Sequence, residues 1–335
     1  MFESCTPDGH SSDLYPRWLG DIGGTNARFG WQSAPGGHVD DVLVLPCAEY
    51  DTLADAAQAY LQRTGKAAPA CAAFGIANPV LGDAIRMTNH HWAFSVHELR
   101  QTLGLQRLVM VNDFTALALA LPTLPETALR QVGGGARVPN AAIGILGPGT
   151  GMGVSGLLPV GHQDKWLPLS GEGGHVTLAA TNDWEHQVIQ QLRARYGHVS
   201  LERVVSGIGL VDMYHAICEL KASGGREITT AAQVLERAQA EPGSSANDAI
   251  DLFCALLGDA AGNLALTLGA RGGIFIGGGI VPRLGERFEQ SQFRARFEAK
   301  GRFKGYLQHI PTLVIESKVS PALYGASKAL DLGVW

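Results

Sequence analysis

Two segments of the chain, starting at Leu19 and 127 positions later at Leu146, share one pattern. Each has an apolar strand, a turn rich in Gly with one Thr, and a second apolar strand, which predicts a β-hairpin. The predicted strands are Arg17–Asp21 and Ala27–Trp31 in the first hairpin, and Ala142–Leu146 and Met152–Leu158 in the second. A unit that occurs twice outlines a duplicated domain, so we expect two related lobes.

Strands and helices alternate along the rest of the chain, which is typical of the α/β class. Further strands are predicted at Val39–Pro46, Cys71–Ala77, Leu108–Val111, Gly273–Ile276 and Thr312–Glu316. Helices are predicted at Tyr50–Gly65, His97–Leu103, Phe114–Leu121, Trp184–Tyr196, Ile208–Leu220, Thr230–Ala240, Ala249–Leu268 and Leu323–Leu330. Because no long Pro- or Ser-rich linker separates them, we expect the lobes to pack around a cleft.

Composition narrows the class of protein. A chain of 335 residues suits two domains or one large two-lobed body, and its 46% apolar content is enough for a packed core. The net charge of −5 argues against a nucleic-acid partner, because no excess of Lys and Arg is available to displace counterions from phosphates. The apolar runs Thr115–Leu124 and Ala255–Leu268 are shorter than the about 20 residues that span a membrane, so no membrane partner is expected.

The cysteines and the N-terminal residues indicate in which cellular compartment the protein is expected. The five Cys include no C-x-x-C pair, so neither a disulfide framework nor a thiolate zinc site is expected. Residues 1–16 are polar and lack the basic head and apolar run of a signal peptide. We therefore expect a cytoplasmic protein with a frayed N-terminal tail, residues 1–17.

Many of the 43 glycines cluster at the ends of apolar runs, where the chain turns tightly or lets a ligand approach its backbone. The first cluster is Gly20-Asp21-Ile22-Gly23-Gly24-Thr25, whose N–H groups and Thr hydroxyl could donate to phosphate oxygens. Asp21 could hold Mg²⁺ through water. When the cluster is taken alone, an ordinary tight hairpin is the preferred interpretation.

Two further glycine clusters are candidates for nucleotide contacts. The turn Gly147–Gly151 is a second candidate phosphate cradle. Gly277-Gly278-Gly279 follows a predicted buried strand. These glycines could form a flat surface that contacts adenosine, or they could simply form a strand-to-helix turn. Neither the G-x-x-x-x-G-K-[ST] loop nor the G-x-G-x-x-G fingerprint occurs, which disfavours a P-loop enzyme and a nicotinamide-dependent dehydrogenase.

Asn112 and Asp113 stand where a predicted strand ends and a predicted helix begins. A carboxylate at the carboxyl end of a strand can accept a proton from a substrate hydroxyl. Asp and Asn are also among the commonest residues at helix N-termini, so the pair could simply start the helix. Both interpretations remain open from the residues alone.

Two more polar side chains are candidates for a ligand site on the residues alone. Glu172 and His175 emerge from the run Gly171–His175, which suits a polyhydroxylated ligand because Glu accepts from vicinal hydroxyls and His both donates and accepts. For Glu202 and Arg203, near a helix start, an exposed ion pair is the default interpretation.

Taken together, these motifs resemble the bacterial glucokinase family, the proteobacterial type outside the ROK group, within the actin, hexokinase and heat-shock-chaperone ATPase superfamily. The motifs occur in family order from about Trp18 to Leu332: Gly20–Arg28, Met87–Ser95, Asn112–Ala116, Gly171–His175, Glu202–Gly207 and Gly277–Arg283. The Cys/His zinc cluster of the ROK group is absent from the sequence.

The resemblance implies an α/β fold with two domains, each built on a ribonuclease-H-like core, and an interdomain cleft. It implies a small domain of residues 18–123 plus 317–335, a large domain of 124–316, and a cytoplasmic homodimer. The implied reaction transfers the γ-phosphoryl group of ATP, with Mg²⁺, to the 6-hydroxyl of glucose. Rival interpretations are a kinase for another hexose or an amino sugar, and a sugar-sensing regulator that has lost the chemistry.

The family's site residues carry over to matching positions of this chain. Asp113 would be the general base and Asn112 a sugar ligand, and Glu172, His175 and Glu202 would bind the remaining hydroxyls. The ATP contacts would be Gly20, Asp21, Ile22, Gly23, Gly24, Thr25, Gly147, Gly149, Thr150, Gly151, Gly277, Gly278 and Gly279. Pro148 departs from the family pattern, and since it has no N–H, the second turn loses one donor.

Overall fold

The computed structural model describes residues 14–161, 165–225, 227–317 and 320–332. The chain divides into two compact units; the first ends at Leu124 and resumes after Ser317, and the second is Pro125–Ser317. Residues 1–13 of the predicted tail lie outside the described residues. Arg17 is the last residue of the predicted tail and the first of the predicted strand Arg17–Asp21; it is fully buried in that strand, where its guanidinium pairs with Asp331 at 2.6 Å.

The first unit is built on a five-stranded sheet of order β3-β2-β1-β4-β7. Its strands are β1 (Arg17–Ile22), β2 (Asn26–Gln32), β3 (Val39–Pro46), β4 (Cys71–Ile76) and β7 (Arg107–Asn112). The first three are antiparallel neighbours, whereas β1, β4 and β7 run parallel. Every residue of β4 is buried, as expected for a central strand covered on both faces.

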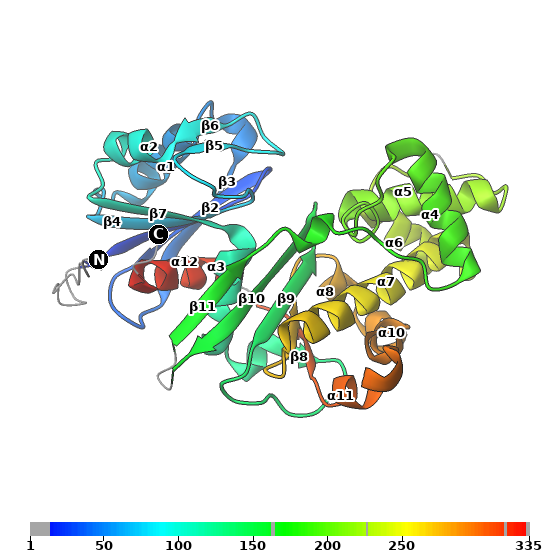
Figure 1. Ribbon diagram of the computed structural model, residues 1–335. Helices are drawn as coiled ribbons and strands as arrows, with labels where there is room; N and C mark the ends of the chain where they lie inside the picture. The colour runs from blue at the N-terminus through cyan, green and yellow to red at the C-terminus, as the bar shows by residue number, and fades with distance from the viewer. Residues whose placement is uncertain (1–13, 162–164, 226, 318–319, 333–335) are drawn as a thin grey trace. The chain divides into compact units, whose positions relative to one another are not determined.

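Helices cover both faces of this sheet, with α3 and α12 on one side and α1 and α2 on the other (Figure 1). Their bounds are α1 (Leu53–Thr64), α2 (Val96–Thr102), α3 (Asp113–Ala120) and α12 (Pro321–Leu332). The shorter elements are η2 (Cys47–Glu49), β5 (Ala84–Arg86), β6 (Ala93–Ser95) and η3 (Leu121–Thr123). Small residues let α3 and α12 pack closely, because a Cβ at Gly325 would collide with the Ala116 carbonyl.

The second unit contains a six-stranded sheet of order β11-β10-β9-β12-β13-β8. Its strands are β8 (Leu129–Gln131), β9 (Ile143–Pro148), β10 (Met152–Val160), β11 (Lys165–Ser170), β12 (Ile274–Ile276) and β13 (Thr312–Ile315). As in the first unit, three antiparallel strands continue into parallel ones, here β9, β12 and β13. The repeated topology confirms the duplicated α/β fold predicted from the two hairpins.

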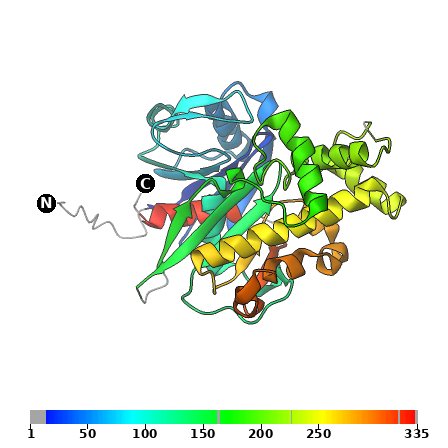
Figure 2. The same cartoon turned by 45° about the vertical axis from the view of Figure 1, so that its right-hand side comes forward.

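The helices of the second unit gather on and around its longest helix, α7 (Ser245–Leu268), which runs alongside β9 (Figures 1 and 2). The others are α4 (Asp183–Tyr196), α5 (Gly207–Leu220), α6 (Ala231–Ala240), α8 (Val281–Leu284), α9 (Glu286–Gln290), α10 (Phe293–Glu298) and α11 (Lys304–Gln308). Single turns are η4 (Glu126–Ala128), η5 (Gly173–His175) and η6 (Gly301–Phe303).

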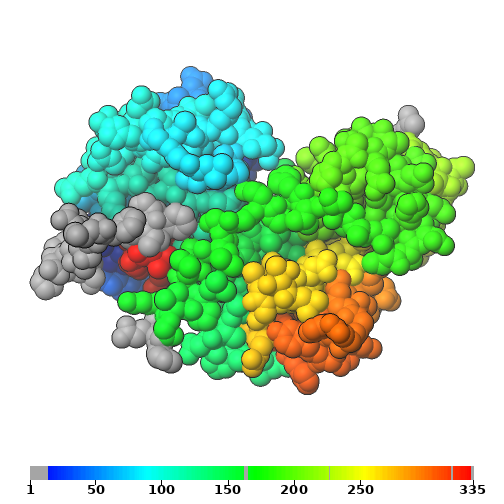
Figure 3. Space-filling view, in the orientation of Figure 1, coloured from blue at the N-terminus to red at the C-terminus, as the bar shows by residue number. Residues whose placement is uncertain are grey.

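Helix α7 is the one described segment long and apolar enough to cross a membrane, contrary to our expectation that no run reaches that length. It begins at Ser245, four residues before the predicted start. Of its most apolar window, 67% is buried inside the second unit, and part of the remainder reaches the surface beside the orange residues (Figure 3). Burial of this kind is what the core helix of a globular domain shows.

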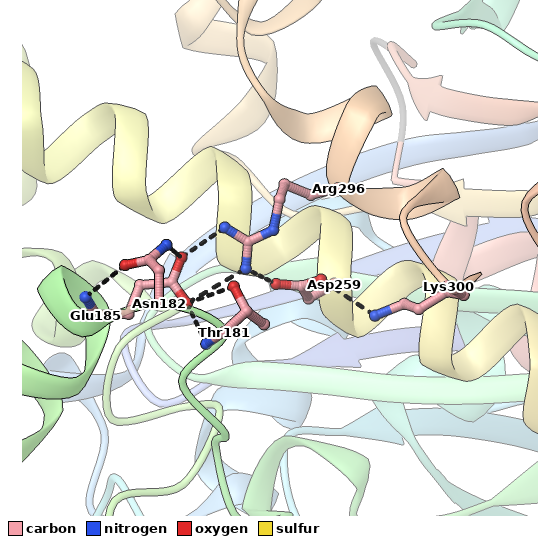
Figure 4. Close-up of polar contacts among 6 residues, drawn as sticks. All are labelled: Thr181, Asn182, Glu185, Asp259, Arg296 and Lys300. Carbon is pink, nitrogen blue, oxygen red and sulfur yellow. Dashed lines mark hydrogen bonds and ion pairs between the residues drawn. The ribbon is translucent and has the colours of Figure 1, made fainter.

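A buried cluster of charges ties the start of α4 to α7 and α10 (Figure 4). Arg296 on α10 donates to Glu185 at 2.5 Å and also to Asp259 on α7, which Lys300 approaches to 3.1 Å. Glu185 further accepts from the N–H of Thr181 at 2.7 Å. Burial alone would raise the pKa of Glu185, but the bonds from Arg296 and Thr181 outweigh it and the net pKa lies below the usual value.

Candidate active site

Three parallel strands of the first unit end side by side. The strand register places Ile22 of β1 opposite Ile76 of β4, and Ile76 opposite Asn112 of β7. The next residues, including Gly23 and Asp113, therefore follow at one edge of the sheet. Since neighbouring strands lie about 4.8 Å apart, the backbones of Ile22 and Asn112, two strands apart, are separated by about 10 Å. The first glycine turn and the candidate base thus share one edge.

Asn112, and not Asp113, is the N-cap of α3. Its Oδ1 accepts from the N–H groups of Phe114 at 3.0 Å and Thr115 at 3.1 Å. Its Nδ2 donates to Oδ1 of Asp113 at 3.1 Å, and Asp113 Oδ1 also accepts from the Phe114 N–H at 2.8 Å. Asp113 is the first helical residue and is partly buried. The amide of Asn112 therefore holds the carboxylate beside it in place.

The first glycine turn is shorter than the cluster that we considered. Gly20 and Ile22 are buried residues of β1, paired with β2, so only Gly23–Thr25 form the tip. The Gly23 N–H bonds to the Asn26 carbonyl at 2.9 Å. A Cβ on Gly24 would lie 2.9 Å from the Asn89 carbonyl oxygen, so a larger residue does not fit there. Thr25 is exposed.

Asp21 reaches this turn from the end of β1. Its Oδ2 pairs with Arg28 at 2.7 Å and accepts from the Ser320 hydroxyl at 2.7 Å. Among the described residues, no group of three or more His, Cys, Asp or Glu side chains is arranged to hold a metal ion. A lone carboxylate suits Mg²⁺, which commonly keeps several waters and shares its remaining ligands with nucleotide phosphates. Asp21 therefore fits a water-mediated contact and not a direct protein cage.

The loop after β4 contributes one residue, Asn78, that the sequence prediction missed. Asn78 follows β4 at the same edge, and its Oδ1 accepts from both the N–H and the hydroxyl of Thr88, at 3.1 and 3.0 Å. The carbonyl of Asn78 lies 3.5 Å from Nδ2 of Asn112. Asn78 was recognisable as a polar residue at a strand end, but its partner lies ten residues away.

The Met87–Ser95 motif lies against the first turn through Asn89, and two side chains nearby have shifted pKa values. Burial, with the charge of His91 as a smaller cause, lowers the pKa of His90. Cys47 donates from Sγ to the Gly23 carbonyl, and burial raises its pKa to about 11. The thiol beneath the turn is therefore protonated near neutral pH and is no candidate nucleophile.

The second unit brings its two glycine clusters together at the edge where β9 and β12 end. Gly147 and Pro148 belong to β9, so the turn proper is Gly149–Gly151. Pro148 pairs with Met152 at the end of the hairpin. The N–H that Pro148 lacks is therefore absent from the base of the turn and not from its tip. Gly278 has φ +81°, and a Cβ there would collide with the Pro148 carbonyl. Glycine is therefore required where the two clusters meet.

Helix α5 also begins beside the second turn, since the N–H of Gly207 donates to the Gly149 carbonyl at 2.8 Å. This helix has 14 residues, and its N-terminal dipole favours a negatively charged group nearby. The turn Gly149–Gly151, the cluster Gly277–Gly279 and the start of α5 therefore form one region of the second unit that is suited to an anion.

Glu202 joins the second turn to the Glu172–His175 segment. Its Oε2 accepts from the Met152 N–H at 2.8 Å, and its own N–H donates to the Gly174 carbonyl at 2.8 Å. The expected surface pair with Arg203 is wrong: within the described residues Glu202 binds backbone, and Arg203 stacks on the Tyr196 ring at 4.3 Å. Three of the predicted sugar ligands are thus neighbours.

Glu172 and His175 are both exposed, with Nε2 of His175 4.0 Å from Oε2 of Glu172. The segment that carries them is not a loose loop. His175 N–H bonds to the Glu172 carbonyl at 3.0 Å, and a Cβ on Gly174 would collide with the Met152 carbonyl. Backbone packing therefore fixes the segment, while the two polar side chains stay accessible to a ligand.

Comparison with known proteins supports the resemblance seen in the sequence. A family model described as Glucokinase matches residues 18–332. The chain belongs to the glucokinase family. It is 52% identical over 319 residues to a glucokinase of Chromobacterium violaceum, covering 95% of this chain and 90% of that protein. It is 51% identical to a glucokinase of Aromatoleum aromaticum, covering 96% of each chain.

The solved structures agree with this family assignment. The crystal structure of a glucokinase from an Antarctic psychrotroph matches with a TM-score of 0.83 and 34% identity, covering 95% of this chain and 99% of that one. The family assignment and the two-unit α/β fold predicted from the six motifs are therefore confirmed. The individual roles of the site residues stay predictions.

Proposed function

We propose that this glucokinase-family enzyme transfers the γ-phosphoryl group of ATP to the 6-hydroxyl of glucose, giving glucose 6-phosphate and ADP. Its close similarity to glucokinases over nearly the whole chain supports the substrate. The observation that carries the mechanism is the common sheet edge at which Asp113 and the Gly23–Thr25 turn follow β7 and β1. Phosphoryl transfer needs an acceptor hydroxyl and a phosphate group held close together, with little covalent chemistry from the protein.

Asp113 is the proposed general base. Its carboxylate accepts the proton of the sugar 6-hydroxyl as the oxygen attacks phosphorus. Asn112 donates to that carboxylate from Nδ2 at 3.1 Å and also caps α3. The N-terminus of the helix therefore does not need the Asp113 side chain as its cap. We further propose that Asn112 contacts the sugar, as its partly buried position permits.

Glu172, His175 and Glu202 are the proposed ligands for the remaining sugar hydroxyls. Carboxylates accept from hydroxyl groups, and the imidazole can donate or accept. A sugar that lacks one of these hydroxyls should be strongly rejected, because the side chain that binds the hydroxyl would be left unpaired. The backbone bond between Glu202 and Gly174 supports the assignment of all three residues to one ligand.

The glycine clusters are the proposed nucleotide contacts. The N–H groups of Gly24 and Thr25 in the first turn, and of Thr150 and Gly151 in the second, are the proposed donors to the phosphates. Gly23 and Gly149 shape the turns, because their own N–H groups already donate to the carbonyls of Asn26 and Gly151. Gly277–Gly279 is proposed to lie under the adenosine. Mg²⁺ accompanying ATP would offset phosphate charge, with Asp21 as its water-mediated neighbour. Gly20, Ile22 and Gly147 support these turns from within the sheets.

We also propose the two units as the two functional domains of a cytoplasmic homodimer. The cysteine usage supports a reducing compartment, because Cys47, Cys71, Cys218 and Cys254 are all free and buried.

A coupled assay for ADP release tests the proposed function. Glucose, mannose, fructose and N-acetylglucosamine are offered as acceptors at equal concentration, with and without Mg²⁺. The proposal expects the highest kcat/KM with glucose and an absolute need for Mg²⁺. A higher kcat/KM with another sugar would identify a different hexose or amino-sugar kinase, and no turnover with any of them would identify a sugar-binding regulator.

A further inference from the structure

Asp21 is held by two side chains from opposite ends of the chain. Its Oδ2 accepts a hydrogen bond of 2.7 Å from Arg28 Nη1 and another of 2.7 Å from Ser320 Oγ. Arg28 lies directly opposite on β2, whereas Ser320 immediately precedes α12. Only 19% of the Asp21 side chain is exposed, so water competes weakly for these bonds.

Both bonds fall on the same carboxylate oxygen. Two donors on Oδ2 restrict rotation of the carboxylate about its terminal torsion, which is otherwise broad. Within the described residues no protein donor is bonded to Oδ1, so this oxygen is the one left to accept from water or a ligand. The arrangement therefore presents one defined acceptor at the end of β1, one residue from the first turn.

Arg28 and Ser320 act on Asp21 in different ways. A carboxylate next to a phosphate site repels the phosphate oxygens, and the guanidinium of Arg28 offsets that charge. The hydroxyl of Ser320 carries no charge, so its bond changes the orientation of the carboxylate without changing the net charge. Substituting Ser320 therefore tests orientation alone.

We propose that Ser320 is a positioning residue that directs Oδ1 of Asp21 toward the water shell of the Mg²⁺ bound with nucleotide. The inference rests on the proposed function, because it requires that the Gly23–Thr25 turn binds nucleotide phosphates. The hydroxyl acts only through Asp21. Its loss should therefore weaken the metal-dependent part of nucleotide binding and leave the metal-independent part unchanged.

Titration calorimetry of ADP, with and without Mg²⁺, tests this role in the full-length protein. In Ser320→Ala, ADP should bind about tenfold more weakly with Mg²⁺ and within about twofold of wild type without it, the size expected for one bond to a charged acceptor. Ser320→Thr retains the hydroxyl and should restore the affinity. Thr52→Ala removes the hydroxyl that caps α1 in the same unit and should bind ADP like wild type under both conditions.

Two results would overturn the proposal. One is a Ser320→Ala variant that binds ADP with Mg²⁺ as tightly as wild type, and the other is an equal loss with and without Mg²⁺. If Ser320→Ala does not fold, the same titrations are carried out with Ser320→Cys, whose thiol is of similar size and a weaker donor. A wild type that binds ADP but does not phosphorylate glucose would refute the proposed function and leave this comparison interpretable.

Discussion

The amide of Asn112 donates from Nδ2 to Oδ1 of Asp113 at 3.1 Å, while its Oδ1 accepts the N–H groups of Phe114 and Thr115 and caps α3. One side chain thus ends β7, starts the helix and restrains the carboxylate next to it. The sequence left open whether Asn112 and Asp113 only start the helix or also supply a base. In the structure Asn112 is the cap, and Asp113 remains the candidate base.

Asn112→Asp separates the cap from the restraint. Asp caps helices as well as Asn does, so the start of α3 should be retained. The variant has no Nδ2 donor and places a second carboxylate beside Asp113, so kcat should fall by about tenfold or more. Asn112→Ala, as a control, should also lose about 1 kcal/mol of stability. Urea unfolding and steady-state kinetics measure both effects, and wild-type turnover in Asn112→Asp would exclude the restraint.

Gly151→Ala tests the link between Glu202 and the second turn. The added Cβ would lie 2.5 Å from Oε2 of Glu202, the oxygen that accepts the Met152 N–H. The carboxylate must move, so the KM for glucose should rise about tenfold, the size of one lost bond to a charged group. Gly149→Ala is the matched control, because nothing lies within 4 Å of its added Cβ. Equal KM values for the two variants would show that Glu202 does not bind the sugar.

The parts of the fold set by local sequence were predictable. Both hairpins combine apolar strands with a glycine turn, and β3 was predicted with its observed bounds, Val39–Pro46. The junction of strand and helix at Asn112–Asp113 is equally local. Helix α7 begins earlier than predicted, because Asn247 and Asp248 are typical of a loop, whereas here they occupy its first turn.

The parts set by distant contacts were not predictable from one sequence. Arg17 stands where the predicted tail meets the predicted strand, and nothing near it in the sequence indicates that Ser327 and Asp331 on α12 bind its guanidinium. Ser320 contacts Asp21 across 299 positions of the chain. Glu202 resembles half of a surface ion pair until the fold brings Met152 next to it. Such partners are defined by topology, and local spacing does not encode them.

Arg296→Met should strongly destabilise the second unit. It leaves Glu185, with a side chain 2% exposed, and Asp259 without their shared guanidinium. Breaking a buried pair in this way costs about 3–5 kcal/mol. Arg287→Met removes the exposed pair with Asp251 and should cost less than about 1 kcal/mol. Chemical denaturation compares the two, and a similar small loss in both would show that the buried cluster adds little stability.

The same cluster predicts how stability depends on pH. The pKa of Glu185 is lowered in the folded protein relative to about 4.3 in the unfolded chain. Its contribution is therefore complete above the unfolded pKa and is lost as the pH falls through the folded pKa. The free energy of unfolding should decrease from about pH 5 downward, and less steeply in Glu185→Gln. Parallel pH profiles for the variant and the wild type would contradict this.

The role of Asp113 as the base is tested most directly by kcat of Asp113→Asn at saturating glucose and ATP. The amide oxygen can still accept the Phe114 N–H, so the start of α3 should be retained. We predict that kcat falls by about 10²–10⁴-fold, the usual contribution of a general base, while calorimetry shows glucose binding within about threefold of wild type. Turnover close to that of the wild type would contradict the mechanism.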